Sequence, residues 1–174
     1  MRIYLTGFMA SGKSTVGPRV AERLGASFID LDAQIERRTG QSIPELFAEG
    51  GEAAFRAEEA AALRATAEQD AAVIALGGGA LVDDANRAWA LQHGVVVYLR
   101  VAVDTILDRV ADQAQHRPLL QDDAGAPLPR NAMRARITQM LRQRRPLYEE
   151  AHVTVDAGQA PDVVAAAVVK AVRD

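Results

Sequence analysis

Cysteine is absent from this 174-residue sequence, and only two of its twenty basic residues are lysines. Without thiols, neither disulfides nor thiolate metal sites can contribute to the fold, which suits a reducing cytoplasm. No apolar run approaches the ~20 residues of a membrane span, and Met1 to Thr6 lack the basic start and apolar stretch of a signal peptide. We therefore expect a soluble, cytoplasmic protein.

An excess of positive charge is also missing, since the formal net charge is -3 at pH 7. This balance argues against general attraction to nucleic acids or anionic membranes. The arginines crowded into 130–145 have no interleaved aromatic side chains, so they indicate a solvated helix rather than a nucleic-acid interface. The three histidines lack the spacing of metal ligands, and we assign no metal role to His93, His116 or His152.

The order of the apolar runs predicts the fold class. Five strand-like runs are separated mostly by segments with helical periodicity: Arg2 to Leu5, Ser27 to Ile29, Ala72 to Leu76, Val95 to Leu99 and Val153 to Val155. Runs that are apolar on both faces are typical of parallel strands covered by helices on each side. We expect one α/β domain over 1–174, a three-layer, doubly wound, five-stranded parallel sheet.

Local signals place several helix boundaries and one loop. Ser42 before Pro44 and Glu45 is typical of a helix start, and Asp83 can open another helix. The segment 112–131 contains prolines and a glycine, which predicts a mobile surface loop. An arginine-rich helix should follow it and extend to about Arg144.

The strongest motif is a complete Walker A pattern that runs from Gly7 to Ser14, between an apolar strand and a helix. Gly7 and Gly12 allow backbone amides to turn inward around phosphate oxygens. Lys13 would reach the β and γ phosphates of ATP, and the Ser14 hydroxyl would coordinate Mg²⁺. The alternative, an ordinary glycine turn, is disfavoured by the complete motif in this context. The expected nucleotide-binding residues of the loop are Gly7, Ala10, Ser11, Gly12, Lys13, Ser14 and Thr15.

Two carboxylates follow the second apolar run. Asp30 and Asp32 stand two apart, so in extended geometry both side chains would project to the same side. Ligands of open parallel sheets bind beyond the carboxyl ends of the strands. We expect Asp30 to hold Mg²⁺ through its water shell, and Asp32 to orient a substrate hydroxyl and accept its proton. The alternative is that Asp32 only caps the next helix.

Two further features are ambiguous when taken alone. Arg56 has Glu59 three positions later, so the carboxylate can orient the guanidinium, although such pairs are more often solvated. Three consecutive glycines, 77–79, follow an apolar strand, which indicates that another group approaches the backbone closely. A tight turn is the alternative explanation.

Taken together, these motifs resemble those of shikimate kinases over nearly the whole chain. The resemblance rests on the order of the Walker A loop, Asp30-Leu31-Asp32, Phe55-Arg56, Gly77-Gly78-Gly79, Arg117-Pro118-Leu119-Leu120 and Arg144-Arg145-Pro146-Leu147-Tyr148. It implies the P-loop kinase (adenylate-kinase-like) architecture and a monomer. It also implies a shikimate-binding helical region at about 31–62.

The resemblance implies a set of shikimate contacts, which we call the acceptor residues: Asp32, Arg56, Gly78, Gly79 and Arg144. The two arginines would bind the carboxylate and Asp32 the ring hydroxyls, which agrees with the match between guanidinium forks and planar carboxylates. Support for this pocket would come from Phe47, Phe55 and Glu59.

The resemblance further makes 112–131 a lid that carries Arg117 over the phosphates, where it would act in catalysis. Arg109 would stack near adenine, and Pro161 would belong to a loop that lines it. The stretch 121–131 is longer than the lid that the resemblance implies.

The predicted activity is therefore transfer of the ATP γ-phosphoryl group to the 3-hydroxyl of shikimate, on the chorismate route to aromatic amino acids. Lys13, Asp32 and Arg117 would be the catalytic residues, with Ser14 and Asp30 at the metal. Two alternatives remain open: another small-metabolite kinase, such as a gluconate or nucleoside kinase, and a protein that binds nucleotide without turnover. The paired arginines argue against a neutral nucleoside as the acceptor.

Overall fold

The computed structural model describes residues 1–174 apart from the side chain of His116, so the expectation for His116 lies outside the described residues. Five parallel strands form one sheet in the order β2-β3-β1-β4-β5. Their bounds are β1 (Arg2–Thr6), β2 (Ser27–Asp30), β3 (Ala72–Ala75), β4 (Val95–Arg100) and β5 (Val153–Asp156). All five strands predicted from apolar runs are confirmed.

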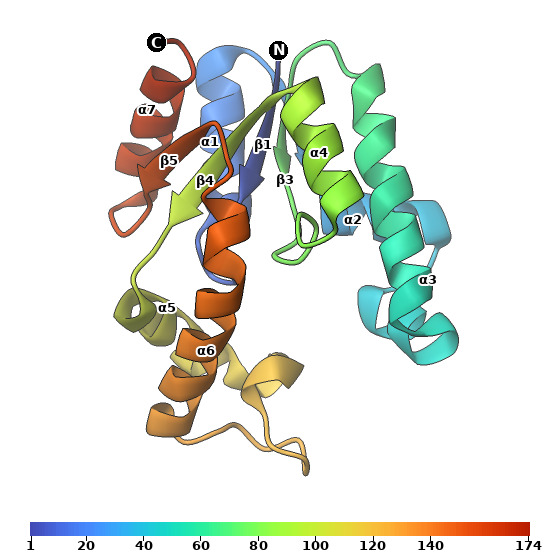
Figure 1. Cartoon of the computed structure of the whole chain (residues 1–174), viewed down its shortest axis with the longest axis vertical. Coiled ribbons are helices and arrows are strands. Elements are labelled where there is room, and N and C mark those ends of the chain that lie inside the picture. Colours follow the sequence, from blue (N-terminus) through green and yellow to red (C-terminus); the bar gives the residue numbers. More distant parts are fainter.

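Helices connect the strands and cover both faces of the sheet (Figure 1). Their bounds are α1 (Lys13–Leu24), α2 (Leu31–Thr39), α3 (Ile43–Ala65), α4 (Asp84–His93), α5 (Val103–Val110), α6 (Arg130–Tyr148) and α7 (Pro161–Ala171). Three short 3₁₀ helices complete the chain: η1 (Thr66–Glu68), η2 (Ala111–His116) and η3 (Pro118–Leu120). The three-layer α/β fold predicted from the sequence is confirmed.

The central strand shows how the two helix layers arise. Alternate side chains of a strand face opposite sides of the sheet. Ile3 and Leu5 are buried in the core shared with α1, α5, α6 and α7, whereas Tyr4 is buried in the core shared with α2, α3 and α4. Both faces of β1 are therefore buried. The phosphate loop begins at the carboxyl end of this strand, which close packing holds rigidly.

Two predicted helix starts are confirmed by their caps. Ser42 and Glu45 form a capping box at the start of α3, with Pro44 in the first turn. The Asp83 side chain accepts a hydrogen bond from the amide of Asn86 at the start of α4.

The arginine-rich helix α6 is longer than expected. It extends past Arg144 to Tyr148 and includes Pro146 in its last turns. The segment 112–131 contains η3 and part of η2, and Gln121 pairs with Pro127 in an isolated antiparallel bridge. None of the helices in the described part of the chain has the length and apolar character that a membrane span requires.

Candidate functional site

The phosphate loop joins β1 to α1 at the carboxyl edge of the sheet. Gly7 and Gly12 have φ angles of 149° and 94°, which favour glycine. A Cβ at Gly7 would also stand 2.7 Å from the carbonyl oxygen of Leu99. Among the residues that the structure describes, Ala10 is the one non-glycine residue with positive φ, at 56°. The loop thus has the tight curvature that lets amides converge on an anion at a helix N-terminus.

Lys13 lies inside this curve. Its Nζ donates hydrogen bonds to the carbonyl oxygens of Gly7 at 2.8 Å and Phe8 at 3.0 Å, and to Ser11 Oγ at 3.3 Å. Burial lowers the pKa of Lys13 to about 8, against the opposing influence of the Asp32 and Asp30 carboxylates. Its ammonium group is therefore poorly solvated. Phosphate oxygens would be favourable hydrogen-bond partners for it in place of the loop carbonyls.

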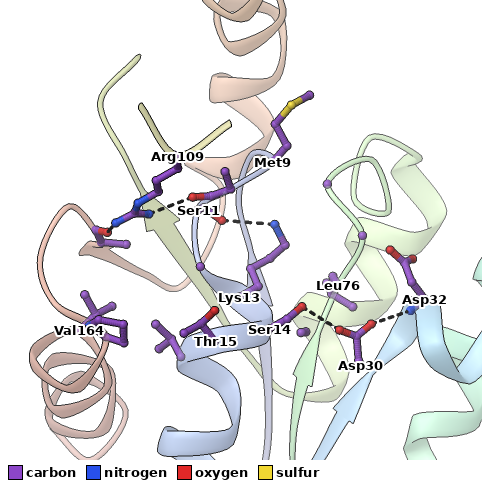
Figure 2. Close-up of a pocket in the computed structure, with 18 of the residues that line it drawn as sticks. Met9, Ser11, Lys13, Ser14, Thr15, Asp30, Asp32, Leu76, Arg109 and Val164 are labelled. Atoms are coloured by element: carbon purple, nitrogen blue, oxygen red, sulfur yellow. Dashed lines mark hydrogen bonds between the residues drawn. The ribbon is translucent and has the colours of Figure 1, made fainter. Parts of the chain in front are cut away.

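A cavity of about 650 Å³ opens in front of the loop (Figure 2). Residues from five parts of the chain line it: Met9 to Val16, Asp30 and Asp32, Ala75 to Gly78, then Arg109, Gln113 and Arg117, and finally Ala157, Gln159, Pro161 and Val164. Its size falls in the range of small-molecule and cofactor sites. The predicted loop residues, apart from Gly7, all lie in its wall.

Asp30 links the phosphate loop to α2. Its Oδ2 accepts a 2.7 Å hydrogen bond from Ser14 Oγ, and its Oδ1 accepts from the amides of Asp32 and Ala33 (Figure 2). The predicted extended pairing of Asp30 with Asp32 is wrong, because β2 ends at Asp30 and Asp32 lies in the first turn of α2. Asp30, rather than Asp32, is the cap of that helix. Because Asp30 forms these capping hydrogen bonds, α2 begins at the next residue, Leu31.

The oxygen atoms at this point fit Mg²⁺. A hydroxyl and a carboxylate are hard ligands that Mg²⁺ accepts alongside water and phosphate oxygens. Ser14 Oγ and Asp30 Oδ2 are adjacent, and both residues line the cavity. These two residues could therefore hold the ion beside a bound triphosphate.

Asp32 faces the same cavity. Its Oδ1 is buried and has no hydrogen-bond partner among the described residues. Burial, followed by the nearby charge of Asp30, raises the pKa of Asp32. An orphaned buried carboxylate oxygen is costly in the free protein, so a ligand hydroxyl would be a favourable partner.

The glycine turn at 77–79 brings the acceptor residues together. A Cβ at Gly77 would lie 3.2 Å from Asp32 Oδ1, one at Gly78 would lie 3.8 Å from Arg144 Nη1, and one at Gly79 would lie 2.9 Å from Arg56 Nη2. Three side chains thus approach three consecutive glycines. The close approach predicted from the sequence is confirmed, and it involves side chains of α2, α3 and α6.

Arg56 is oriented by acidic neighbours. Its Nη1 forms a 2.7 Å ion pair with Oε2 of Glu59, a side chain that is 1% exposed. Glu59 Oε1 is buried without a partner in the described structure, and burial raises the pKa of Glu59. Phe55 lies under the guanidinium at 5.2 Å and stacks on Phe47. The expected supporting residues therefore surround Arg56.

Arg144 approaches the glycine turn from α6. Its Nη1 lies 3.5 Å from the carbonyl oxygen of Gly78, and its guanidinium stands 5.9 Å from the ring centroid of Phe8. Arg56, Gly79 and Arg144 do not line the 650 Å³ cavity. They adjoin it through Gly77 and Gly78, so these three residues flank the cavity.

The far wall of the cavity is held by Arg109. Its guanidinium donates to the carbonyl oxygens of Ala10 at 2.9 Å and Ala157 at 2.8 Å (Figure 2). It thereby joins the phosphate loop to the loop before Pro161, which also lines the cavity. Sequence reasoning missed the Ala157 carbonyl, because a main-chain contact across the fold leaves no signal in residue type.

Arg117 also lines the cavity, and Gln113 orients it. Nη2 of Arg117 donates a 2.8 Å hydrogen bond to Gln113 Oε1, while its Nε is buried without a partner in the described part of the chain. Sequence reasoning missed Gln113, although its position four residues before Arg117 was a usable signal.

Comparisons with known proteins agree on one family. The family model described as "Shikimate kinase" matches residues 9–173. A shikimate kinase of Salinibacter ruber is 58% identical over 172 residues, which cover 99% of this chain and 84% of that protein. One of Chlorobium chlorochromatii is 45% identical over 88% of this chain and 80% of its own length.

Solved structures give the same result. Shikimate kinase of Acinetobacter baumannii in complex with shikimate has a TM-score of 0.86 and 37% identity, covering 99% of this chain and 92% of that chain. A gluconokinase of Sinorhizobium meliloti, covering 99% of this chain and 91% of its own, has a TM-score of 0.58 at 18% identity, which indicates a shared fold alone. The phosphate loop, the acceptor residues and these relatives lead to one conclusion: the chain belongs to the shikimate kinase family.

Proposed function

We propose that this protein transfers the γ-phosphoryl group of ATP to the 3-hydroxyl of shikimate, giving 3-phosphoshikimate and ADP on the chorismate route. The observation that carries this proposal is the position of Gly78. A Cβ there would lie 3.6 Å from the Gly7 carbonyl oxygen, 3.8 Å from the Met9 amide and 3.8 Å from Arg144 Nη1. The phosphate loop and an acceptor arginine therefore adjoin the same residue.

The triphosphate would occupy the cavity in front of the phosphate loop. Loop amides and Lys13 would hold the β and γ phosphates, exchanging the internal hydrogen bonds of Lys13 for phosphate oxygens. Ser14 and Asp30 would hold Mg²⁺, which supplies positive charge at the phosphates when bound. Ala157, Pro161 and the Arg109 guanidinium would line the base end of the nucleotide.

Shikimate would lie on the far side of the glycine turn from β1. Arg56 and Arg144 would bind its carboxylate, because guanidinium groups pair well with planar carboxylates. The amides of Gly78 and Gly79 and the carboxylate of Asp32 would bind the remaining polar atoms. A polyhydroxylated acid suits these donors and acceptors, whereas a neutral nucleoside would offer no carboxylate to the two guanidinium groups.

Catalysis would consist mainly of alignment and charge neutralisation. The acceptor oxygen forms a bond to the γ-phosphorus while the bond to the β–γ bridging oxygen breaks, and the hydroxyl proton passes to Asp32. Lys13 and Arg117 would offset negative charge on the moving group. Closure of the segment 112–131 would bring Arg117 in and exclude water, which limits ATP hydrolysis.

ATP as the donor supports a cytoplasmic site of action. All side chains of the proposed site come from one chain, which supports a monomer as the active form.

Coupled ADP-release assays should compare shikimate with quinate, gluconate and nucleosides, at equal concentrations with and without Mg²⁺. We expect rapid ADP release only with shikimate and Mg²⁺, and 3-phosphoshikimate as the product by mass spectrometry. Faster turnover of gluconate or a nucleoside than of shikimate would contradict the proposed acceptor.

A further inference from the structure

The carbonyl oxygen of Gly78 is held by the last residue of α6. Tyr148 Oη donates a 2.6 Å hydrogen bond to it. The Tyr148 side chain is 1% exposed, and its ring stacks on that of Tyr98 with centroids 5.1 Å apart. A buried phenol packed in this way has little rotational freedom, so its hydroxyl is a fixed anchor for the loop between β3 and α4.

The same carbonyl oxygen lies within reach of an acceptor arginine. Arg144 is one helical turn before Tyr148, and its Nη1 stands 3.5 Å from the oxygen. That distance is at the outer limit of a hydrogen bond, whereas the Tyr148 bond is short. Tyr148 therefore supplies the strong donor to Gly78, and Arg144 keeps most of its hydrogen-bonding capacity for a ligand.

The bond also fixes the direction of an amide group. The peptide between Gly78 and Gly79 is trans, so its N–H points opposite to its carbonyl. Because the carbonyl faces Tyr148, the N–H of Gly79 faces away from α6. No acceptor for this N–H occurs among the described hydrogen bonds. Arg56 contacts the same residue, since a Cβ at Gly79 would lie 2.9 Å from its Nη2.

We propose that Tyr148 is a positioning residue for the acceptor, which fixes the Gly78–Gly79 peptide and leaves Arg144 free for an anionic ligand. Without the hydroxyl, the Gly78 carbonyl would be left with Arg144 as its donor. A partly buried carbonyl favours a hydrogen-bond partner, so the guanidinium would move onto it and away from the substrate carboxylate. This inference rests on the proposed function, because it assumes an acceptor with a carboxylate.

The test compares Tyr148→Phe with Tyr98→Phe. Both variants remove one hydroxyl from the same pair of buried, stacked rings, but the Tyr98 hydroxyl makes no described hydrogen bond to the loop 77–82. We expect Tyr148→Phe to raise KM for shikimate about tenfold, the effect of one hydrogen bond in a binding site. KM for ATP and kcat should stay within about twofold in both variants.

Two results would overturn the inference. One is an equal KM for shikimate in Tyr148→Phe and Tyr98→Phe. The other is a parallel rise in KM for ATP and shikimate, which would indicate general loosening of the fold. Thermal unfolding midpoints identify a variant that has only lost stability.

A second measurement needs no substrate. Hydrogen exchange followed by mass spectrometry should show faster exchange in peptides that cover 76–83 in Tyr148→Phe than in Tyr98→Phe. If the wild type turns over shikimate but neither KM nor exchange responds to Tyr148→Phe, the positioning role is wrong and the proposed function stands. If the wild type does not use shikimate, the proposed function fails, and unchanged exchange would then refute the anchoring of the loop as well.

Discussion

Ser14 and Asp30 meet in a 2.7 Å hydrogen bond from Oγ to Oδ2, although sixteen residues separate them in the chain. Ser14 Oγ is the proposed Mg²⁺ ligand, and Asp30 would hold the ion through its water shell. Ser14→Ala should therefore raise the Mg²⁺ concentration for half-maximal activity on the order of tenfold, as losses of metal-site partners do. Ser14→Thr keeps a hydroxyl and should restore the wild-type requirement, measured by titrating Mg²⁺ at saturating ATP. Equal Mg²⁺ requirements in all three proteins would remove Ser14 from the metal site.

Asp32→Asn preserves the shape of the side chain but removes the carboxylate that would take the proton from the acceptor hydroxyl. We expect kcat to fall by roughly 10²–10⁴, the usual contribution of a general base, with ATP affinity little changed. ADP release gives kcat, and calorimetric titration gives ATP affinity. Asp70→Asn is the matched control, because Asp70 is exposed at the opposite end of the sheet, before β3. Wild-type kcat in Asp32→Asn would exclude this role.

Arg144→Ala should raise KM for shikimate on the order of a hundredfold, because it removes one partner of a partly buried charge pair. The KM for ATP should change little, since Arg144 does not line the nucleotide cavity. Arg142→Ala is the control, because Arg142 is an exposed arginine on the same helix. Similar kinetics for the two variants would show that Arg144 does not bind the acceptor.

Lys13 should couple nucleotide binding to proton uptake. Burial lowers its pKa to about 8 in the free protein, and phosphate oxygens in contact with the ammonium would raise the pKa in the complex. Between these two values, binding takes up protons, and ATP affinity falls as the pH rises through about 8. Calorimetry at about pH 8.5 in buffers of different ionisation enthalpy measures this uptake.

Lys13→Arg provides the control for that experiment, because a guanidinium stays protonated throughout. It should bind ATP without the uptake that is specific to the wild type. Equal proton uptake in the two proteins would assign the effect to another group.

The fold could be predicted because its main signals are local. A strand buried on both faces is apolar at successive positions over a short length, as in β1 and β4, and this combination favours a strand over a helix. Caps such as Ser42 and Asp83 act through their own side chains, which accept hydrogen bonds from backbone amides three residues later, so the sequence alone places them.

The geometry of Asp30 and Asp32 was not predictable from strand periodicity. The wrong expectation assumed that β2 continued past Asp30, whereas the Asp30 side chain accepts two amides and starts α2 immediately. Both carboxylates still reach the cavity, because the first turn of a helix also projects side chains toward the preceding strand end. The residue types indicated the chemistry, whereas the hydrogen bonds of the Asp30 cap determine where the two side chains lie.

Contacts across the fold were beyond the sequence. The approach of Arg56 and Arg144 to neighbouring glycines joins α3 and α6 to the end of β3, over a sequence distance of 66 residues for Arg144. In the sequence, only the resemblance to a known family indicated that these arginines and glycines would lie together. The Tyr148 hydroxyl gave no signal, because a tyrosine at the end of a helix usually serves packing.

The hydrogen-bonded ladder between β1 and β3 governs the spacing of the reacting groups. Leu5 of β1 pairs with Ala75 of β3, just before the phosphate loop and the glycine turn. Adjacent strands stand about 4.8 Å apart, and their separation is among the stiffest dimensions in a protein. On the proposed function, donor and acceptor would thus be spaced by the backbone of two neighbouring strands. Side chains and the segment 112–131 would then tune specificity while the distance between the two substrates stays constant.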